Sequence, residues 1–204
     1  MRKRKRIIEL ILFVFVFFIY AFSVSNNIAF WDSAEFITSN YNLQATHPPG
    51  APFYTLLCSF ILFFVSGSWS ALVINLVSAF FGALTVVLLY RITFLIALKL
   101  LKNSLSKNSN NIAVLAGIGS ALTLAFSTTF WAVSTEAEVY TLSSFLLLLM
   151  FYFMLLWNNC DEAINSRKIL LGIVFLLGLS TGVHLINLSI IIPLSILYIH
   201  KRNG

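Results

Sequence analysis

Long apolar segments set what this sequence can fold into. They recur along its whole length, at residues 7–25, 51–66, 70–98, 112–133, 139–157 and 169–200. About 20 apolar helical residues span the roughly 30 Å hydrocarbon core of a bilayer. Hydrophobic residues make up 59% of the chain and charged residues only 10%, whereas about a quarter of a soluble domain is charged. The sequence therefore predicts an all-α, polytopic membrane protein with the lipid bilayer as its surroundings.

The positively charged residues gather in short clusters beside or between the apolar segments. Met1-Arg-Lys-Arg-Lys-Arg6 opens the chain, and further clusters lie around Lys102, Lys168 and Lys201. Such clusters are typical of cytoplasmic loops, whereas a nucleic-acid-binding protein spreads its Lys and Arg over a groove. The net charge of +6 therefore indicates no nucleic-acid partner. The apolar run after the basic N-terminus is longer than that of a secretory signal, which favours an uncleaved first span.

The charge distribution also indicates which segments cross the bilayer. If all crossed, with 169–200 as two spans broken near His184 to Asn187, the basic loops 99–107 and 167–168 would lie outside, against the positive-inside rule. Segment 51–66 is the weakest candidate, because it reaches only about 24 Å and its Pro-rich start suits a helix that begins at the membrane surface. Without it, we predict about six transmembrane helices, both termini cytoplasmic, and all thirteen Lys and Arg on the cytoplasmic face.

The predicted organisation is a single transmembrane module over residues 1–204. Residues 1–25 form the basic N-terminus and first span, 26–69 an outer loop with juxtamembrane helices, and 70–204 five further spans. Cys58 and Cys160 then fall on opposite sides of the membrane and cannot form a disulfide.

The same topology sends most acidic and imidazole side chains to the outer face. They are Asp32, Glu35, His47, Glu136, Glu138 and His184. Structural interpretations exist for each: Asp32 with Glu35, and Thr135 with Glu138, have the spacing of capping boxes. His47 precedes a Pro-Pro turn, and His184 at the end of a span is typical of a hydrogen-bonded packing residue.

The convergence of several segments on one membrane border favours a functional interpretation. Ionisable side chains at such a border are costly and tend to mark substrate paths when they gather. Asp32, flanked by Phe30, Trp31 and Phe36, is expected to be partly desolvated, which raises its proton affinity and suits a general base.

Four motifs occur in order along the chain: Trp31-Asp-Ser-Ala-Glu-Phe36, His47-Pro-Pro-Gly-Ala-Pro52, Thr135-Glu-Ala-Glu-Val-Tyr140 and Gly178-Leu-Ser-Thr-Gly-Val-His184. They resemble the N-terminal part of bacterial proteins similar to transmembrane protein 260, which look like protein O-mannosyltransferases of the GT-C superfamily. The resemblance implies that Asp32 is the base that deprotonates the acceptor hydroxyl, with Glu35 beside it. It places His47 near a lipid phosphate, and gives Glu138, Tyr140 and His184 to substrate binding.

The function implied by this resemblance is the transfer of a sugar such as mannose from a polyprenyl-phosphate donor to a hydroxyl of a protein or glycan acceptor. Transfer would invert the anomeric carbon at the periplasmic face of a bacterial inner membrane. No metal ligands are assigned, but a divalent metal stays open, because the outer face has no Lys or Arg to meet the phosphate. A groove for the isoprenoid tail is expected along the helix that holds Phe53, Leu56, Leu57, Phe60, Phe63 and Phe64, unless these residues simply face lipid.

Two alternatives come from other functional classes. A transporter fragment would use the same carboxylates as an ion path and predicts polar residues at mid-membrane depth, for which Asn75 and Asn187 are the main candidates. A non-catalytic scaffold or pseudoenzyme fragment is the other, since members of the resembled family run well beyond 204 residues.

Overall fold

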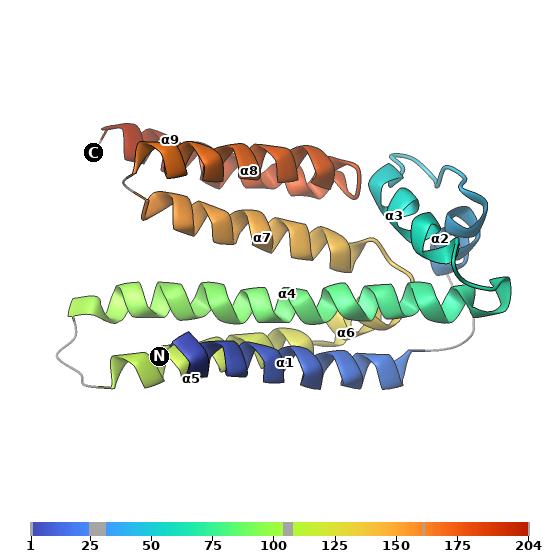
Figure 1. Ribbon diagram of the computed structural model, residues 1–204, viewed down its shortest axis with the longest axis horizontal. Helices are drawn as coiled ribbons and strands as arrows, with labels where there is room; N and C mark the ends of the chain where they lie inside the picture. Colours follow the sequence, from blue (N-terminus) through green and yellow to red (C-terminus); the bar gives the residue numbers. More distant parts are fainter. Residues whose placement is uncertain (1, 25–31, 104–107, 161, 204) are drawn as a thin grey trace.

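A bundle of long helices with a small helical cap makes up the protein in a computed structural model, which describes residues 2–24, 32–103, 108–160 and 162–203. All regular elements among these residues are helical (Figure 1). The long helices lie side by side. The two short helices over residues 32–42 and 52–62, which form the cap, gather at one end of the bundle. The elements are α1 (Arg2–Ser23), α2 (Asp32–Asn42), α3 (Pro52–Leu62), η1 (Gly67–Trp69), α4 (Ser70–Leu100), η2 (Leu101–Asn103), α5 (Ser109–Ala125), α6 (Thr128–Thr135), α7 (Tyr140–Asn158), α8 (Ala163–Thr181), η3 (Leu185–Ile190) and α9 (Ile191–Asn203).

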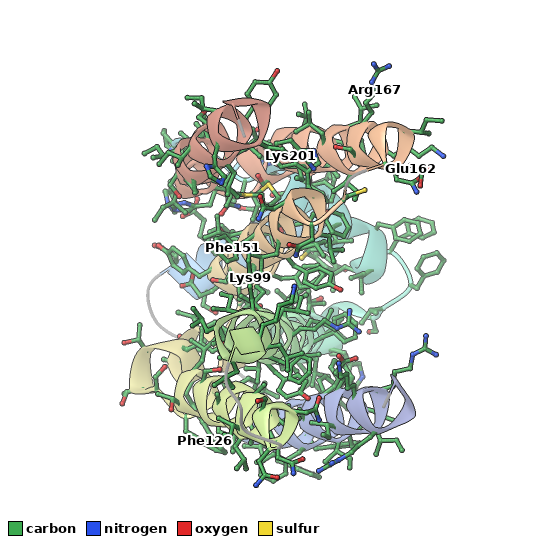
Figure 2. The ribbon with its side chains drawn as sticks, turned by 90° about the vertical axis from the view of Figure 1, so that its left-hand side faces the viewer. Lys99, Phe126, Phe151, Glu162, Arg167 and Lys201 are labelled. Carbon is green, nitrogen blue, oxygen red and sulfur yellow. The ribbon has the colours of Figure 1, made fainter. Side chains whose placement is uncertain are left out.

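Both chain termini lie at the end of the bundle opposite α2 and α3 (Figure 1). Figure 2 looks onto this end and shows Lys99, Arg167 and Lys201 there. The Lys201 ammonium donates to the carbonyl oxygens of Trp157, at 2.5 Å, and Cys160, at 2.6 Å. It therefore closes the C-terminal turn of α7, whose carbonyls have no helical partner. The predicted clustering of basic residues at one end is present, and the compartment that this end faces stays a prediction.

Among the described residues, four helices are long and apolar enough to cross a membrane by length and composition, or five if the bent pair α5–α6 is one span. The four are Arg4–Ser23, Gly67–Leu100, Tyr140–Asn158 and Ile164–Thr181. The final apolar helix, Leu185–Lys201, is shorter than these. The multi-pass helical architecture is thus confirmed, while the count of six spans stays a prediction.

The predicted segment 112–133 is not one straight helix. α5 ends at Ala125, and α6 continues at an angle of 65°. The Ser127 hydroxyl donates to the Leu124 carbonyl, which offers the backbone an alternative to the next helical bond. The Tyr20 hydroxyl of α1 donates to the Ala125 carbonyl at 2.8 Å. The bend is therefore stabilised from both its own sequence and a neighbouring helix.

The predicted break in segment 169–200 is confirmed. α8 ends at Thr181, and the chain resumes as the 3-10 helix η3 after His184. The short helix predicted after Pro52 is present: α3 has 11 residues and Pro in its first turn, so it spans only about 16 Å, and its position at the membrane surface stays a prediction. The two cysteines are free, as expected, with Cys58 in α3 and Cys160 beyond α7.

The helical cap is fastened both to itself and to the bundle. The Ser59 hydroxyl of α3 donates to the Asn40 carbonyl of α2 at 2.5 Å. The Phe53 N–H donates to the Gly182 carbonyl just after α8 at 2.7 Å. A Cβ on residue 182 would lie 3.0 Å from that of Phe53, so a side chain there would require Phe53 to move by a few tenths of an ångström. The cap is therefore docked onto the end of α8, beside His184.

One ion pair joins two of the long helices. Arg91 of α4 donates to both carboxylate oxygens of Glu9 in α1, from Nε at 2.8 Å and from the terminal nitrogen at 2.6 Å. Arg91 lies nine residues before the end of α4, about 14 Å along the helix. A carboxylate on the neighbouring helix thus compensates the charge of Arg91, and the placement of all thirteen Lys and Arg on the cytoplasmic face stays a prediction.

Candidate active site

Most of the residues predicted to be functional line one small cavity between the cap and the bundle. Asp32 comes from the start of α2, His47 from the α2–α3 loop, Glu138 and Tyr140 from the entry to α7, and His184 from the turn after α8. The cavity has a volume of about 50 Å³. Five of the six predicted site residues thus line it together, and the sixth, Glu35, bonds to one of them.

Glu35 and His47 form a two-bond contact. The backbone N–H of His47 donates to Glu35 Oε1 at 2.5 Å. The ring atom Nδ1 of His47 lies 2.8 Å from Glu35 Oε2. This hydrogen bond raises the pKa of His47 above its usual range and, with the backbone bond, lowers the pKa of Glu35. Both shifts favour the charged forms, as in an ion pair. Both Glu35 oxygens hold His47, so the capping interpretation of Glu35 is not supported.

Glu138 reaches the cavity by a route that the sequence did not indicate. Thr135 is the last residue of α6, and its hydroxyl donates to the Trp131 and Ala132 carbonyls. The capping box predicted for Thr135 and Glu138 is therefore wrong, because α6 ends where a cap for α7 was expected. Instead, the Glu138 N–H donates to the hydroxyl of Ser78 at 3.3 Å, and that hydroxyl donates back to the Glu138 carbonyl at 3.5 Å.

Ser78 belongs to a face of small residues on α4 that holds the chain from α6 to α7. One turn along, a Cβ on Gly82 would lie 2.6 Å from the Ser134 hydroxyl oxygen. A further turn along, the Thr85 hydroxyl lies 3.4 Å from the Thr141 carbonyl. Residues 78, 82 and 85 share one helix face because α-helical neighbours recur every three or four positions. α4 therefore determines where the Glu138 backbone lies.

Glu138 is the desolvated carboxylate of the site. Its Oε2 atom is buried and has no hydrogen-bond partner among the described residues. Burial, followed by the nearby charges of Asp32 and Glu136, raises the pKa of Glu138 to about 7, with His47 and the Val139 N–H acting in the opposite direction. Asp32, by contrast, is exposed. The desolvation predicted for Asp32 is therefore found at Glu138, and Phe30 and Trp31, on which that prediction depended, lie outside the described residues.

Tyr140 and His184 form one wall of the cavity. Their rings pack with centroids 5.5 Å apart. His184 also caps η3, because its Nδ1 accepts the Ile186 N–H at 3.2 Å. The structural interpretation of His184 is thus confirmed, and the same side chain lines the cavity as well. With Nδ1 accepting, the neutral ring carries its proton on Nε2, which leaves a donor for another partner.

Asp32, Glu35 and His47 are also close enough to bind a cation. One possible ligand atom from each lies within 4.8 Å of the others. In the described arrangement, however, Glu35 Oε2 bonds to His47 Nδ1 and Glu35 Oε1 accepts the backbone N–H of His47. The geometry is thus that of an ion pair, and no step proposed below needs a metal.

Two larger cavities flank the site. The first, about 570 Å³, lies along the α2–α3 loop and α3. It shares four lining residues with the small cavity that holds Asp32 and His47, called the polar cavity from here on: Thr46, Pro49, Gly50 and Ala51. The second, about 330 Å³, is entirely apolar and lies between α1, α3 and α4. Of the predicted groove residues, Leu56 lines the first cavity and Leu57 the second, whereas Phe53 packs against the core and the remaining three are exposed: Phe60, Phe63 and Phe64.

Comparison with known proteins identifies the family. Residues 32–204 match the model of the family described as protein O-mannosyl-transferase TMEM260 N-terminal domain. The protein O-mannosyl-transferase TMEM260 of Mus musculus is 33% identical over 150 residues, which are 73% of this chain and 19% of the mouse protein. The chain therefore spans about a fifth of that relative's length. No solved structure matches it. Because the family model covers most of the chain, the chain belongs to the family of the TMEM260 N-terminal domain.

Proposed function

We propose that this chain carries the catalytic residues of a GT-C-type glycosyltransferase that moves a sugar such as mannose from a polyprenyl phosphate to a hydroxyl of a protein or glycan. Its membership in a family named for an O-mannosyl-transferase supports sugar transfer in general. The observation that carries the finer proposal is the single cavity lined by Asp32, His47, Glu138, Tyr140 and His184.

The chemistry is a single displacement. Asp32 removes the proton of the acceptor hydroxyl as its oxygen attacks the anomeric carbon of the sugar. The bond from that carbon to the phosphate oxygen breaks, and polyprenyl phosphate leaves with the electron pair. Attack opposite the leaving group inverts the anomeric carbon, as in other one-step glycosyl transfers. His47, kept charged by Glu35, faces the phosphate and offsets its negative charge.

The donor reaches the site from the bilayer. The 570 Å³ cavity is lined in part by apolar residues of α3 and the preceding loop, and its wall is shared with the polar cavity. An isoprenoid tail beside α3 would therefore bring its phosphate to His47. In this proposal the cap lies on the periplasmic side of a bacterial inner membrane, and both termini lie in the cytoplasm, as the positive-inside rule predicts.

The transporter alternative receives little support from the buried amides. Asn187 is buried and accepts a hydrogen bond from the Ser143 hydroxyl at 3.0 Å. It also donates to the Ser180 carbonyl next to the break in α8. These contacts assign Asn187 to the packing of the α8–η3 turn against α7.

The decisive experiment is Asp32→Asn in the full-length protein. The variant should lower sugar transfer by about 10²–10⁴-fold, the usual contribution of a general base, without changing expression. Asn caps a helix as well as Asp does, so an active variant would leave Asp32 only a structural role. Glu162→Gln, at the opposite end of the bundle, is the matched control and should stay active.

The same assay tests the donor. Purified protein is given a polyprenyl-phosphate sugar or the matching nucleotide sugar, with no lipid-sugar synthase present. Transfer from the lipid donor alone is expected. Direct use of the nucleotide sugar would contradict the lipid-donor proposal.

A further inference from the structure

We propose that Glu138 acts as a neutral carboxylic acid whose O–H donates a hydrogen bond to the phosphate of the donor lipid. This inference rests on the proposed function and assigns Glu138 a specific task within it. The carboxyl keeps its hydrogen throughout, so no additional proton is transferred beyond the one that passes from the acceptor to Asp32.

The site needs such a donor because it has few cationic groups. The segments that form this end of the bundle contain no Lys or Arg: residues 7–90, 112–157 and 169–199 have none. A phosphodiester brings one negative charge into a cavity already lined by Asp32 and Glu138. His47 is the cation there, and Glu35 already offsets its charge. If both cavity carboxyls were ionised, like charges would repel the donor.

The position of Glu138 suits it to be the carboxyl that keeps a proton. Its backbone is fixed to the buried Ser78 on α4. Its Oε2 is buried without a partner among the described residues, although the side chain lines the cavity. A buried oxygen with no partner is costly, and a hydrogen bond from this carboxyl to a phosphate oxygen would provide one.

The groups that face Glu138 agree with this assignment. They are Asp32 from α2, His47 from the α2–α3 loop, Tyr54 from α3, Glu136 from the α6–α7 connection that also holds Glu138, Tyr140 from α7 and His184 from the turn after α8. Asp32 and Glu136 disfavour a second negative charge, and burial acts in the same direction. Two carboxyls in one site whose surroundings differ take different protonation states. The exposed Asp32 is then the base, and the half-buried Glu138 is the hydrogen-bond donor.

Binding of the donor without acceptor tests this role. The probe is a polyprenyl-phosphate mannose, whose phosphodiester keeps one charge from pH 5.5 to 8.5. For the unmodified protein, the affinity for the lipid donor should fall roughly tenfold as the pH rises through about 7. Ionisation of Glu138 replaces its hydrogen bond to the phosphate with repulsion between two negative charges. Glu138→Gln keeps an N–H donor and cannot ionise, so its affinity should match that of the unmodified protein at pH 6 and exceed it at pH 8.5, where Glu138 is ionised in the unmodified protein. Glu138→Ala should bind weakly at every pH.

An infrared measurement reads the carboxyl directly. The full-length protein should show a protonated carboxyl band at pH 6 that is lost as the pH rises through about 7 and that Glu138→Gln lacks. The inference is wrong if this band is missing, or if Glu138→Gln binds the donor as weakly as Glu138→Ala. An unchanged pH profile in Glu138→Gln also contradicts it. If the unmodified protein does not bind the lipid donor at any pH, the proposed function itself fails, so the two failures are distinguishable.

Discussion

Two acid–base pairs at opposite ends of the bundle have the same chemistry and different surroundings. Glu9 and Arg91 connect α1 to α4, and the Glu9 side chain is only 15% exposed. Glu35 and His47 connect α2 to the α2–α3 loop, with side chains 39% and 46% exposed. The first pair joins a carboxylate to a base that never loses its charge, and the second joins a carboxylate to a base that titrates near neutral pH.

The difference in surroundings and in the base indicates a structural role for the first pair and a titratable charge for the second. Glu9 packs between α1 and α4 with only 15% of its side chain exposed, and Arg91, 40% exposed, is its partner there, so removing Arg91 leaves a poorly hydrated charge alone. The Glu35–His47 pair is open to water and lies beside the polar cavity. Loss of one partner would change the charge at that cavity without leaving a buried ion. We therefore expect substitutions in the first pair to change stability, and substitutions in the second to change the behaviour of the site.

The largest effect is expected for Arg91→Met. It leaves the Glu9 carboxylate unpaired between α1 and α4, and because the pair is only partly buried we expect the free energy of unfolding to fall by about 2 kcal/mol, less than for a fully buried pair. Unfolding in mixed detergent micelles measures this change. The double variant Glu9→Met, Arg91→Met should recover most of the loss, because no charge is left alone. Equal stability of the single and double variants would contradict a structural role for the pair.

A smaller effect is expected for Gly82→Ala, which tests how far the position of the α6–α7 connection, at the cap end of the bundle, depends on α4. The new Cβ would lie 2.6 Å from the Ser134 hydroxyl oxygen, so the α6–α7 connection has to move. Overpacking of this kind costs about 1–3 kcal/mol. Gly119→Ala in α5 is the matched control, because nothing lies within 4 Å of its added Cβ, and it should be neutral or slightly stabilising. Similar unfolding curves for both variants would argue against tight contact at Gly82.

The smallest effect is expected for Glu35→Gln, read from His47 by NMR. The raised pKa of His47 means that the stability gained by its protonation is present below its ordinary pKa and is lost as the pH rises through the raised value. The lowered pKa of Glu35 means that its contribution is lost as the pH falls through the lowered value. The pair is therefore complete between these two pKa values. Glu35→Gln should bring the pKa of His47 down toward its ordinary value, whereas Arg91→Met should leave it unchanged.

The parts of this structure that follow from charge and helix length were predictable from the sequence. A short helix starting at Pro52, a break at His184 and the meeting of four polar segments at one end all follow from the spacing of apolar and charged residues. These features depend on where the chain can enter lipid, and that depends on composition over long stretches.

The contacts between helices were not predictable in the same way. Nothing local to Glu138 indicates that Ser78, 60 residues earlier, holds its backbone. One signal was available: residues 78, 82 and 85 are all small and recur at helical spacing on an otherwise bulky segment. The sequence also contains a trace of the Glu9–Arg91 pair, since segment 7–25 holds a single acid and segment 70–98 a single base, but pairing them requires the relative depth of the two helices.

The hydrogen bond from Phe53 to Gly182 also concerns the order in which the chain is assembled. The donor belongs to α3 in the cap, whereas the acceptor is made about 130 residues later, on the order of ten seconds at common rates of synthesis. Until α8 has been made, the cap lacks this anchor, and the polar cavity lacks the His184 side of its wall. Completion of the site is thus coupled to insertion of a late helix, and a nascent chain that stops before α8 holds the acidic residues of the site without enclosing them.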